Sequence, residues 1–150
     1  KRDLTISMKK QYKTYSTDET KAVAAELAAQ TPLGSVYSLH GDLGAGKTVF
    51  ASGFARALGI TEAVSSPTFT IVQEYPFERG MFFHLDLYRI DNPEAALAFG
   101  IDEFLYAEDG IALIEWPERI HGLFPPHTVY VDIRRGEKEE ERIITVEQAE

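Results

Sequence analysis

A glycine-rich segment that ends in Lys47 and Thr48 has the residue types and the spacing of a phosphate-binding loop. Residues 41–48 fit the pattern G-x-x-x-x-G-K-[ST] at every constrained position. Glycines let the backbone curl until N–H groups face phosphate oxygens, while the lysine reaches the β- and γ-phosphates and the hydroxyl binds Mg²⁺. The nucleotide-binding residues predicted from this pattern are Gly41, Asp42, Leu43, Gly44, Ala45, Gly46, Lys47 and Thr48.

A nucleotide-hydrolysing site also needs carboxylates for Mg²⁺ and water, and a group that senses the γ-phosphate. Glu115 ends the apolar run 110–114 and is the leading metal-side or water-orienting carboxylate, with a solvent-exposed strand end as the alternative. Asp86 lies two positions after His84 in an alternating segment and is expected to hold Mg²⁺ directly or through water. Thr68 follows Ser-Pro and is a candidate for a switch residue that orders with the triphosphate.

Neighbouring aromatic and polar residues allow both a site role and a structural role. Trp116 is expected either to stack near the nucleotide or a partner, or to lie in the core. At period two, His84, Asp86 and Tyr88 share one strand face, which forms either a wall of the site or the wet side of a hairpin. A lone histidine is more often a hydrogen-bonded structural residue than a catalyst, so a structural role is favoured over a catalytic one for His84.

The phosphate loop is predicted to lie between a strand and a helix. Residues 35–40 are rich in β-formers, and residues 48–58 carry apolar side chains at spacings of three and four before Gly59. A helix N-terminus behind the loop would add partial positive charge to the phosphate cradle. The other expected elements are a strand within 4–15, a capped helix over 16–30, strands over 69–75 and 81–88 around a turn at 76–80, a helix over 92–99, a strand over 110–115, and strands over 128–134 and 142–146 around the charged, solvated turn 136–141.

Composition restricts the class of protein. The 150 residues predict one domain, and residues 1–7, which precede Met8, are either an extension or added residues. The formal net charge of −9 argues against an autonomous nucleic-acid binder. The absence of cysteine excludes disulfides and thiolate chemistry. No apolar run approaches the roughly 20 residues of a membrane span, and the polar start is unlike a signal peptide, so a cytoplasmic enzyme is expected.

Motifs that the sequence lacks narrow the choice further. An Asn-Lys-x-Asp sequence is missing, which disfavours a GTPase, and no long arginine-rich lid follows the loop, which weakens a small-molecule kinase. Two alternatives to an ATPase stay open. One is a small-molecule phosphotransferase, and the other is an ATP-sensing adaptor that does not need hydrolysis.

Four motifs, taken in order and spacing, resemble the bacterial TsaE family, also called YjeE, over roughly residues 10–148. They are Gly41–Thr48, Ser66–Phe69, His84–Arg89 and Ile114–Arg119. The resemblance implies an α/β fold like that of P-loop NTPases, with three layers and a mixed parallel and antiparallel sheet flanked by helices. It also implies that Lys47, Asp86 and Glu115 are catalytic. The metal-side residues would be Thr48, Asp86 and Glu115, with Thr68 in a switch-like loop and Trp116 near the site.

The resemblance further implies an ATPase that uses ATP and Mg²⁺ in the synthesis of threonylcarbamoyladenosine in tRNA. In that family TsaD, working with its paralogue TsaB, performs the transfer, and the TsaE-like subunit hydrolyses ATP to sustain turnover of the pair. We therefore expect weak ATPase activity that these partners stimulate, contact with tRNA only through the complex, and no membrane association. Self-association and the source of an arginine finger (Arg89, Arg119 or a partner) stay open.

Overall fold

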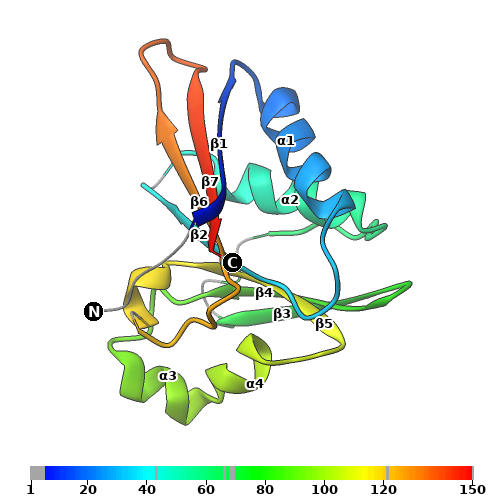
Figure 1. Cartoon of the computed structure of the whole chain (residues 1–150), viewed down its shortest axis with the longest axis vertical. Helices are drawn as coiled ribbons and strands as arrows, with labels where there is room; N and C mark the ends of the chain where they lie inside the picture. Colours follow the sequence, from blue (N-terminus) through cyan, green and yellow to red (C-terminus); the bar gives the residue numbers. More distant parts are fainter. Residues whose placement is uncertain (1–5, 43, 66, 68–69, 121, 150) are drawn as a thin grey trace.

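The chain forms a mixed sheet of seven strands with helices on both faces (Figure 1). The structure, a computed structural model, describes residues 6–42, 44–65, 67, 70–120 and 122–149. Its elements are β1 (Ile6–Thr14), α1 (Thr17–Ala29), β2 (Val36–Gly41), α2 (Lys47–Ala57), β3 (Val72–Phe77), β4 (Gly80–Asp86), α3 (Pro93–Phe99), α4 (Ile101–Leu105), β5 (Gly110–Glu115), the 3₁₀ helix η1 (Pro117–Ile120), β6 (Val129–Arg135) and β7 (Arg142–Ala149). The predicted α/β class with a mixed sheet is confirmed.

The strand order β1-β7-β6-β2-β5-β4-β3 divides the sheet into a parallel centre and antiparallel flanks. Strands β6, β2, β5 and β4 run parallel to one another, so their carboxyl ends meet at one edge. The pairs β1–β7, β6–β7 and β3–β4 are antiparallel. Ligands bind at the carboxyl edge in open α/β sheets, and this edge is where the glycine loop leaves β2.

Two hydrophobic clusters lie between the sheet and the helices, one on each face of the sheet. One joins α1 and α2 to the face that β2, β5, β6 and β7 turn toward them, and the other joins α3 and α4 to the opposite face of β4 and β5. The view in Figure 1 shows α1 and α2 beside the β1–β7–β6 half and α3 and α4 beside the β4–β5 half. The central strands are therefore covered on both faces, whereas β1, β7 and β6 are covered on one.

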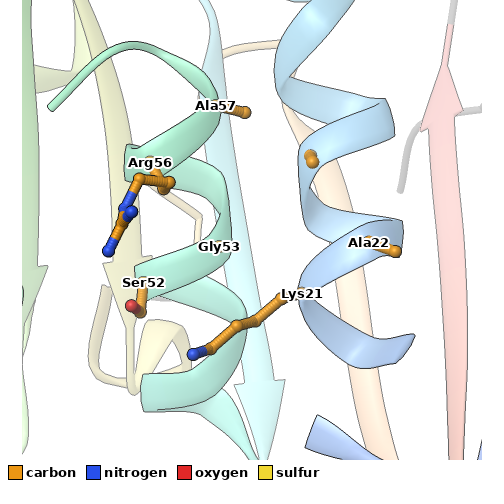
Figure 2. Close-up of a pocket in the computed structure, with 7 residues that line it drawn as sticks. Lys21, Ala22, Ser52, Gly53, Arg56 and Ala57 are labelled. Carbon is orange, nitrogen blue, oxygen red and sulfur yellow. The ribbon is translucent and has the colours of Figure 1, made fainter. Parts of the chain in front are cut away.

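Helix α2 is fixed to the sheet by aromatic packing and by a close approach to α1. Phe50 and Phe54 are fully buried, and the ring of Phe54 lies 4.8 Å from that of Tyr37 between centroids. A Cβ atom on Gly53 would stand 2.7 Å from the Cα of Lys21, so the two helices meet where only glycine fits (Figure 2). This packing holds the N-terminus of α2 in place at the carboxyl edge.

Helix starts follow the predicted capping pattern. The Ser16 hydroxyl accepts a hydrogen bond from the Glu19 N–H at 3.1 Å, and the Glu19 carboxylate accepts one from the Tyr15 N–H at 2.7 Å. The reciprocal contact therefore reaches residue 15 rather than the cap itself. At α3 the Asn92 side chain accepts from the Ala95 N–H at 2.8 Å. Within the described residues, no helix is long and apolar enough to cross a membrane.

The hairpin around residues 72–86 differs from its prediction. Strand β3 runs through Pro76 to Phe77, so the turn is reduced to residues 78 and 79. Proline is tolerated because β3 is an edge strand, where an N–H can be missing without loss of a ladder bond. Strand β4 ends at Asp86, and Tyr88 lies in the following turn. Strand β7 extends beyond its predicted end at 146.

Candidate active site

The predicted glycine loop connects β2 to α2 in the strand–loop–helix order that the motif requires. Gly44 and Gly46 have φ angles of 78° and 112°, a left-handed backbone that favours glycine. A Cβ on Gly41 would lie 2.8 Å from the carbonyl oxygen of Ile133, so glycine is also needed where β2 ends. Within the loop, the Ala45 N–H donates a hydrogen bond to the Asp42 carbonyl at 3.0 Å. Leu43, the remaining predicted position, lies outside the described residues.

Lys47 is a buried cation at the start of α2. Its side chain is 8% exposed, and its Nζ lies 4.2 Å from the centroid of the Trp116 ring. None of the ion pairs in the described part of the chain includes Lys47. Thr48, in the same first turn, is exposed. A buried ammonium that lies over an aromatic face, beside the positive end of a helix, is suited to bind an anion.

The two predicted carboxylates lie side by side at the ends of neighbouring strands. Asp86 and Glu115 are direct partners in the parallel β4–β5 register and are 2% and 3% exposed. The pairing continues one step further, because the Leu87 N–H donates to the Glu115 carbonyl at 3.1 Å. An Asp86 oxygen also accepts from the Tyr88 N–H at 2.9 Å. The alternative interpretation of Glu115 as a solvent-exposed strand end is therefore wrong.

Alternation along the strands places both carboxylates on the face covered by α2. On β4, Phe82 precedes Asp86 by four positions and stacks on Phe54 of α2 at 5.8 Å between ring centroids. On β5, Leu113 precedes Glu115 by two positions and belongs to the same cluster as α2. Since side chains two apart share a face, the carboxylates and the N-terminus of α2 meet at one edge of the sheet.

His84 orients Glu115. Its Nε2–H donates to a Glu115 carboxylate oxygen at 2.6 Å, and the imidazole is fully buried. Its Nδ1 is buried without a hydrogen-bond partner among the described residues. The tautomer protonated on Nε2 leaves Nδ1 as a bare lone pair, which avoids an unsatisfied buried N–H. His84 thus has the structural role that was expected, and the residue that it holds in place is Glu115, a predicted site residue.

The predicted common face of His84, Asp86 and Tyr88 exists only in part. His84 and Asp86 lie on one face, but that face is buried, so its interpretation as the wet side of a hairpin is wrong. Tyr88 is exposed in the turn after β4, because the strand ends at Asp86. Strand alternation predicted the face correctly, but it could not predict that β4 lies inside the sheet and is covered.

Trp116 follows Glu115 in a left-handed conformation, with a φ angle of 59°. Such a backbone is unfavourable for a bulky residue and is typical of functional sites. The indole contacts the Tyr88 ring at 4.9 Å between centroids, and the Cζ of Arg119 lies 6.0 Å from the indole centroid. Trp116 is half-buried, so it packs partly on the core while one face contacts Lys47.

The residues present fit a magnesium ion that completes its ligand shell from outside the protein. Among the described residues, no group of three or more His, Asp or Glu side chains is arranged to hold a metal. Mg²⁺ in nucleotide sites usually takes one or two protein oxygens together with phosphate oxygens and water. The Thr48 hydroxyl and the Asp86 carboxylate supply this kind of set. Thr68, the predicted switch residue, lies outside the described residues.

The hairpin β6–β7 contributes arginines that the sequence analysis missed. Arg142 Nε donates to the Ala45 carbonyl at 2.9 Å, and a Cβ on Gly44 would lie 2.6 Å from the Nη2 of Arg135. The sequence predicted only a solvated turn, which is correct for residues 137–140, whereas Glu141 is buried. No local sequence pattern predicts these contacts, because Arg142 and Ala45 are 97 positions apart.

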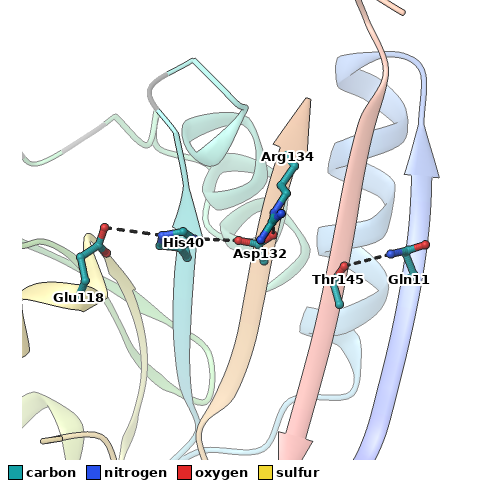
Figure 3. Close-up of polar contacts among 6 residues, drawn as sticks. All are labelled: Gln11, His40, Glu118, Asp132, Arg134 and Thr145. Carbon is teal, nitrogen blue, oxygen red and sulfur yellow. Dashed lines mark hydrogen bonds and ion pairs between the residues drawn. The ribbon is translucent and has the colours of Figure 1, made fainter. Parts of the chain in front are cut away.

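A second histidine–carboxylate pair lies on the opposite face of the sheet (Figure 3). His40 Nδ1 is 2.8 Å from an Asp132 oxygen, and Arg134 Nε donates to the other Asp132 oxygen at 2.7 Å. The His40 side chain is 52% exposed. His40 directly precedes the glycine loop, but its side chain points away from the face that carries Asp86 and Glu115.

Comparisons with known proteins agree with the geometry. Residues 14–144 match the family described as "Threonylcarbamoyl adenosine biosynthesis protein TsaE". A Bacillus subtilis protein named tRNA threonylcarbamoyladenosine biosynthesis protein TsaE is 41% identical over 132 residues, which is 88% of this chain and 82% of the relative. A protein of the same name from Synechocystis is 47% identical over 98 residues, 63% of this chain and 62% of the relative. The crystal structure of Bacillus subtilis YdiB superposes with a TM-score of 0.83 at 35% identity, covering 99% of this chain and 90% of the other. The chain therefore belongs to the TsaE family of tRNA threonylcarbamoyladenosine biosynthesis proteins.

Proposed function

We propose that this chain binds and hydrolyses ATP as a subunit required for threonylcarbamoyladenosine modification of tRNA, acting on the TsaB–TsaD pair to sustain its turnover. One observation carries the proposal. The ends of three adjacent parallel strands bring Gly41, Asp86 and Glu115 to the face of the sheet on which α2 begins. A phosphate cradle and two buried carboxylates at one sheet edge are the parts that phosphoryl transfer to water requires.

The triphosphate would bind at the glycine loop and the start of α2. Backbone N–H groups and the helix N-terminus favour negative charge there. Lys47 would leave the Trp116 face for the β- and γ-phosphates, because an ion pair in a water-poor site is stronger than a cation–π contact. Trp116 would then be free to contact the nucleotide or a partner.

Thr48 and Asp86 would hold Mg²⁺, which when bound neutralises charge on the phosphate oxygens. Glu115 would accept a hydrogen bond from the attacking water and orient it toward the γ-phosphorus. His84 fixes the Glu115 carboxylate through its 2.6 Å hydrogen bond and thereby limits its rotation. The products are ADP and inorganic phosphate.

The low ATPase activity that we expect of the chain alone is explained by the position of Arg119. Arg119 is held against the rings of Trp116 and Tyr88, with its Cζ 6.0 Å and 5.8 Å from their centroids. A cation held on aromatic faces does not stabilise the transferring phosphoryl group unless something moves it. Binding of TsaB–TsaD would either release Arg119 or supply another cation, and cations of this kind accelerate hydrolysis by about 10³-fold or more in other P-loop enzymes.

The test is release of inorganic phosphate from MgATP by the chain alone and with TsaB, TsaD or both. We expect slow release alone and at least about tenfold faster release with both partners. Equal rates with and without the pair would contradict the proposal. A phosphotransferase would put labelled phosphate on an acceptor, and an adaptor would sustain repeated modification with a non-hydrolysable ATP analogue.

A further inference from the structure

Arg142, the first residue of β7, joins the glycine loop to the tip of the β6–β7 hairpin. Its Nε donates to the Ala45 carbonyl at 2.9 Å, and its Nη1 donates to the carbonyls of Glu139 and Glu141 at 3.0 Å and 2.9 Å. One planar guanidinium thus binds three backbone carbonyls from two segments. This geometry uses the fixed fork of arginine, which the single ammonium of lysine cannot reproduce.

The contact with Ala45 sets the direction of a neighbouring N–H. In a trans peptide unit the carbonyl of one residue and the N–H of the next point to opposite sides. With the Ala45 carbonyl held toward Arg142, the Gly46 N–H is aimed away from the hairpin. The carbonyl on the other side of Gly46 accepts from the Phe50 N–H at 3.0 Å, so Arg142 and the first turn of α2 hold the two peptides that flank this glycine.

The hairpin tip is rigid enough to serve as an anchor. The Gly136 N–H donates to the Glu141 carbonyl at 2.9 Å, and one Glu141 carboxylate oxygen accepts from the N–H groups of Glu137 and Lys138, both at 3.1 Å. Glu141 is 6% exposed although the tip is surrounded by water. Arg142 therefore connects the loop to a closed turn with internal hydrogen bonds.

Arg142 acts from behind the loop. A cavity of about 120 Å³ on the α1 side is lined by Thr20, Gly46 and Arg142, among others. The carboxylates Asp86 and Glu115 lie in the other direction along the sheet, because β2 stands between β6 and β5. The guanidinium thus contacts the loop backbone on the hairpin side rather than on the side of the carboxylates.

We propose that Arg142 is a positioning residue for the phosphate cradle: by holding the Ala45 carbonyl it keeps the Gly46 N–H directed at bound phosphate. The inference rests on the proposed nucleotide site. It assigns the hairpin tip, which carries no chemistry itself, a role in phosphate affinity.

The test compares Arg142→Lys with the matched control Arg134→Lys by calorimetric titration with Mg·ADP. Both variants keep their charge, and Arg134 sits on the opposite face, where it contacts Asp132. We expect at least about a tenfold higher Kd for Arg142→Lys, the size expected for loss of a hydrogen bond to a charged group. The control should stay within about twofold.

Two readouts separate positioning from a merely structural role. With TsaB–TsaD present, the KM for ATP should rise while kcat changes by less than about threefold, because the carboxylates are untouched. Amide exchange over residues 44–47 should be faster in Arg142→Lys bound to Mg·ADP than in the bound wild type. Loss of thermal stability without these changes would overturn the positioning role.

Each outcome decides a different claim. A Kd for Arg142→Lys within twofold of wild type overturns the positioning role and leaves the nucleotide site intact. Failure of the wild type to bind Mg·ADP overturns both. Should Arg142→Lys not fold, Glu141→Ala removes the acceptor of the Glu137 and Lys138 N–H groups without altering the arginine, and a wild-type Kd for that folded variant would equally overturn the role.

Discussion

Two histidine–carboxylate pairs occupy opposite faces of the same sheet and differ in almost everything except their geometry. His84 and Glu115 are 2.6 Å apart with side chains 0% and 3% exposed, whereas His40 and Asp132 are 2.8 Å apart with side chains 52% and 28% exposed. Similar contacts therefore have very different surroundings. The difference shows that coverage by neighbouring layers, rather than the pairing itself, decides whether such a pair is removed from water.

The cause lies in how the helices cover the sheet. The parallel centre is covered by α2 on one face and by α3 and α4 on the other, so polar groups there are desolvated. In the described part of the chain, the β6–β7–β1 half has helices, α1 and α2, on one face, and its second face carries exposed and half-buried side chains such as Arg134 and Asp132. A buried pair is strongly destabilised when one partner is lost, while an exposed pair is screened and contributes little.

The largest contrast is expected in catalysis. Glu115→Gln removes the carboxylate that we propose orients the attacking water, and it should lower kcat for ATP hydrolysis by about 10²-fold or more. Asp132→Asn changes the half-buried carboxylate on the opposite face and should leave kcat within about twofold. Phosphate release with TsaB–TsaD present measures both. Equal losses in the two variants would show that the buried pair is not the catalytic one.

The next largest contrast is expected in the free energy of unfolding when each of the two histidines is replaced by alanine. His84→Ala leaves Glu115 buried without its partner and should lower the free energy of unfolding by about 3–5 kcal/mol. His40→Ala removes solvent-accessible contacts with Asp132 and Glu118 and should cost less than about 1 kcal/mol. Urea unfolding with comparable m-values gives both numbers. A difference of less than about 1 kcal/mol between the variants would be inconsistent with the desolvation argument.

Apolar positions on the two halves provide a smaller contrast. Leu113 on β5 is fully buried, and Leu113→Ala should cost about 3 kcal/mol through lost burial and a cavity. Ile143 on β7 is half-buried on the open face, so Ile143→Ala should cost about 1 kcal/mol, since much of its surface already meets water. Thermal and urea unfolding test the ranking, which a reversed order would refute.

The smallest expected effect is on how the free energy of unfolding depends on pH, and it comes from a buried tyrosine in the covered centre of the sheet. Burial raises the pKa of the Tyr37 phenol, and its hydrogen bond with Thr31 partly offsets this shift. Because the unfolded chain ionises first, the stabilisation is complete below pH of about 10 and is lost as the pH rises through the folded pKa. Tyr37→Phe should flatten the decline in stability above pH 10. An unchanged slope would mean that Tyr37 does not contribute.

Local patterns predicted the elements because their causes are local. The Ser16 cap, the spacing of apolar residues over 48–58 and the apolar run before Glu115 depend on nearby residues, and each element formed where it was expected. Pro76 within β3 was not predicted, because its tolerance depends on β3 being an edge strand. Edge position is a property of the whole sheet.

Sequence patterns predicted that Asp86 lies on a strand and that Glu115 ends one, but not how deeply these residues are buried. Alternation placed His84 and Asp86 on one face, but their burial depends on α2 and on neighbouring strands that are distant in the sequence. The contact of Arg142 with Ala45 spans 97 positions and arises only when β6 pairs beside β2. Long-range packing therefore determines the burial of His84 and Asp86 and the contact of Arg142, which the residue pattern did not predict.

The most direct measurement of the central claim is phosphate release from MgATP in the presence of TsaB and TsaD, comparing the wild type with Lys47→Ala. Removing the buried ammonium at the start of α2 should abolish the proposed contact with the β- and γ-phosphates and lower kcat/KM by about 10²-fold or more, while the thermal unfolding midpoint stays close to that of the wild type. Hydrolysis by a folded Lys47→Ala at the wild-type rate would contradict the assignment of this sheet edge as the nucleotide site.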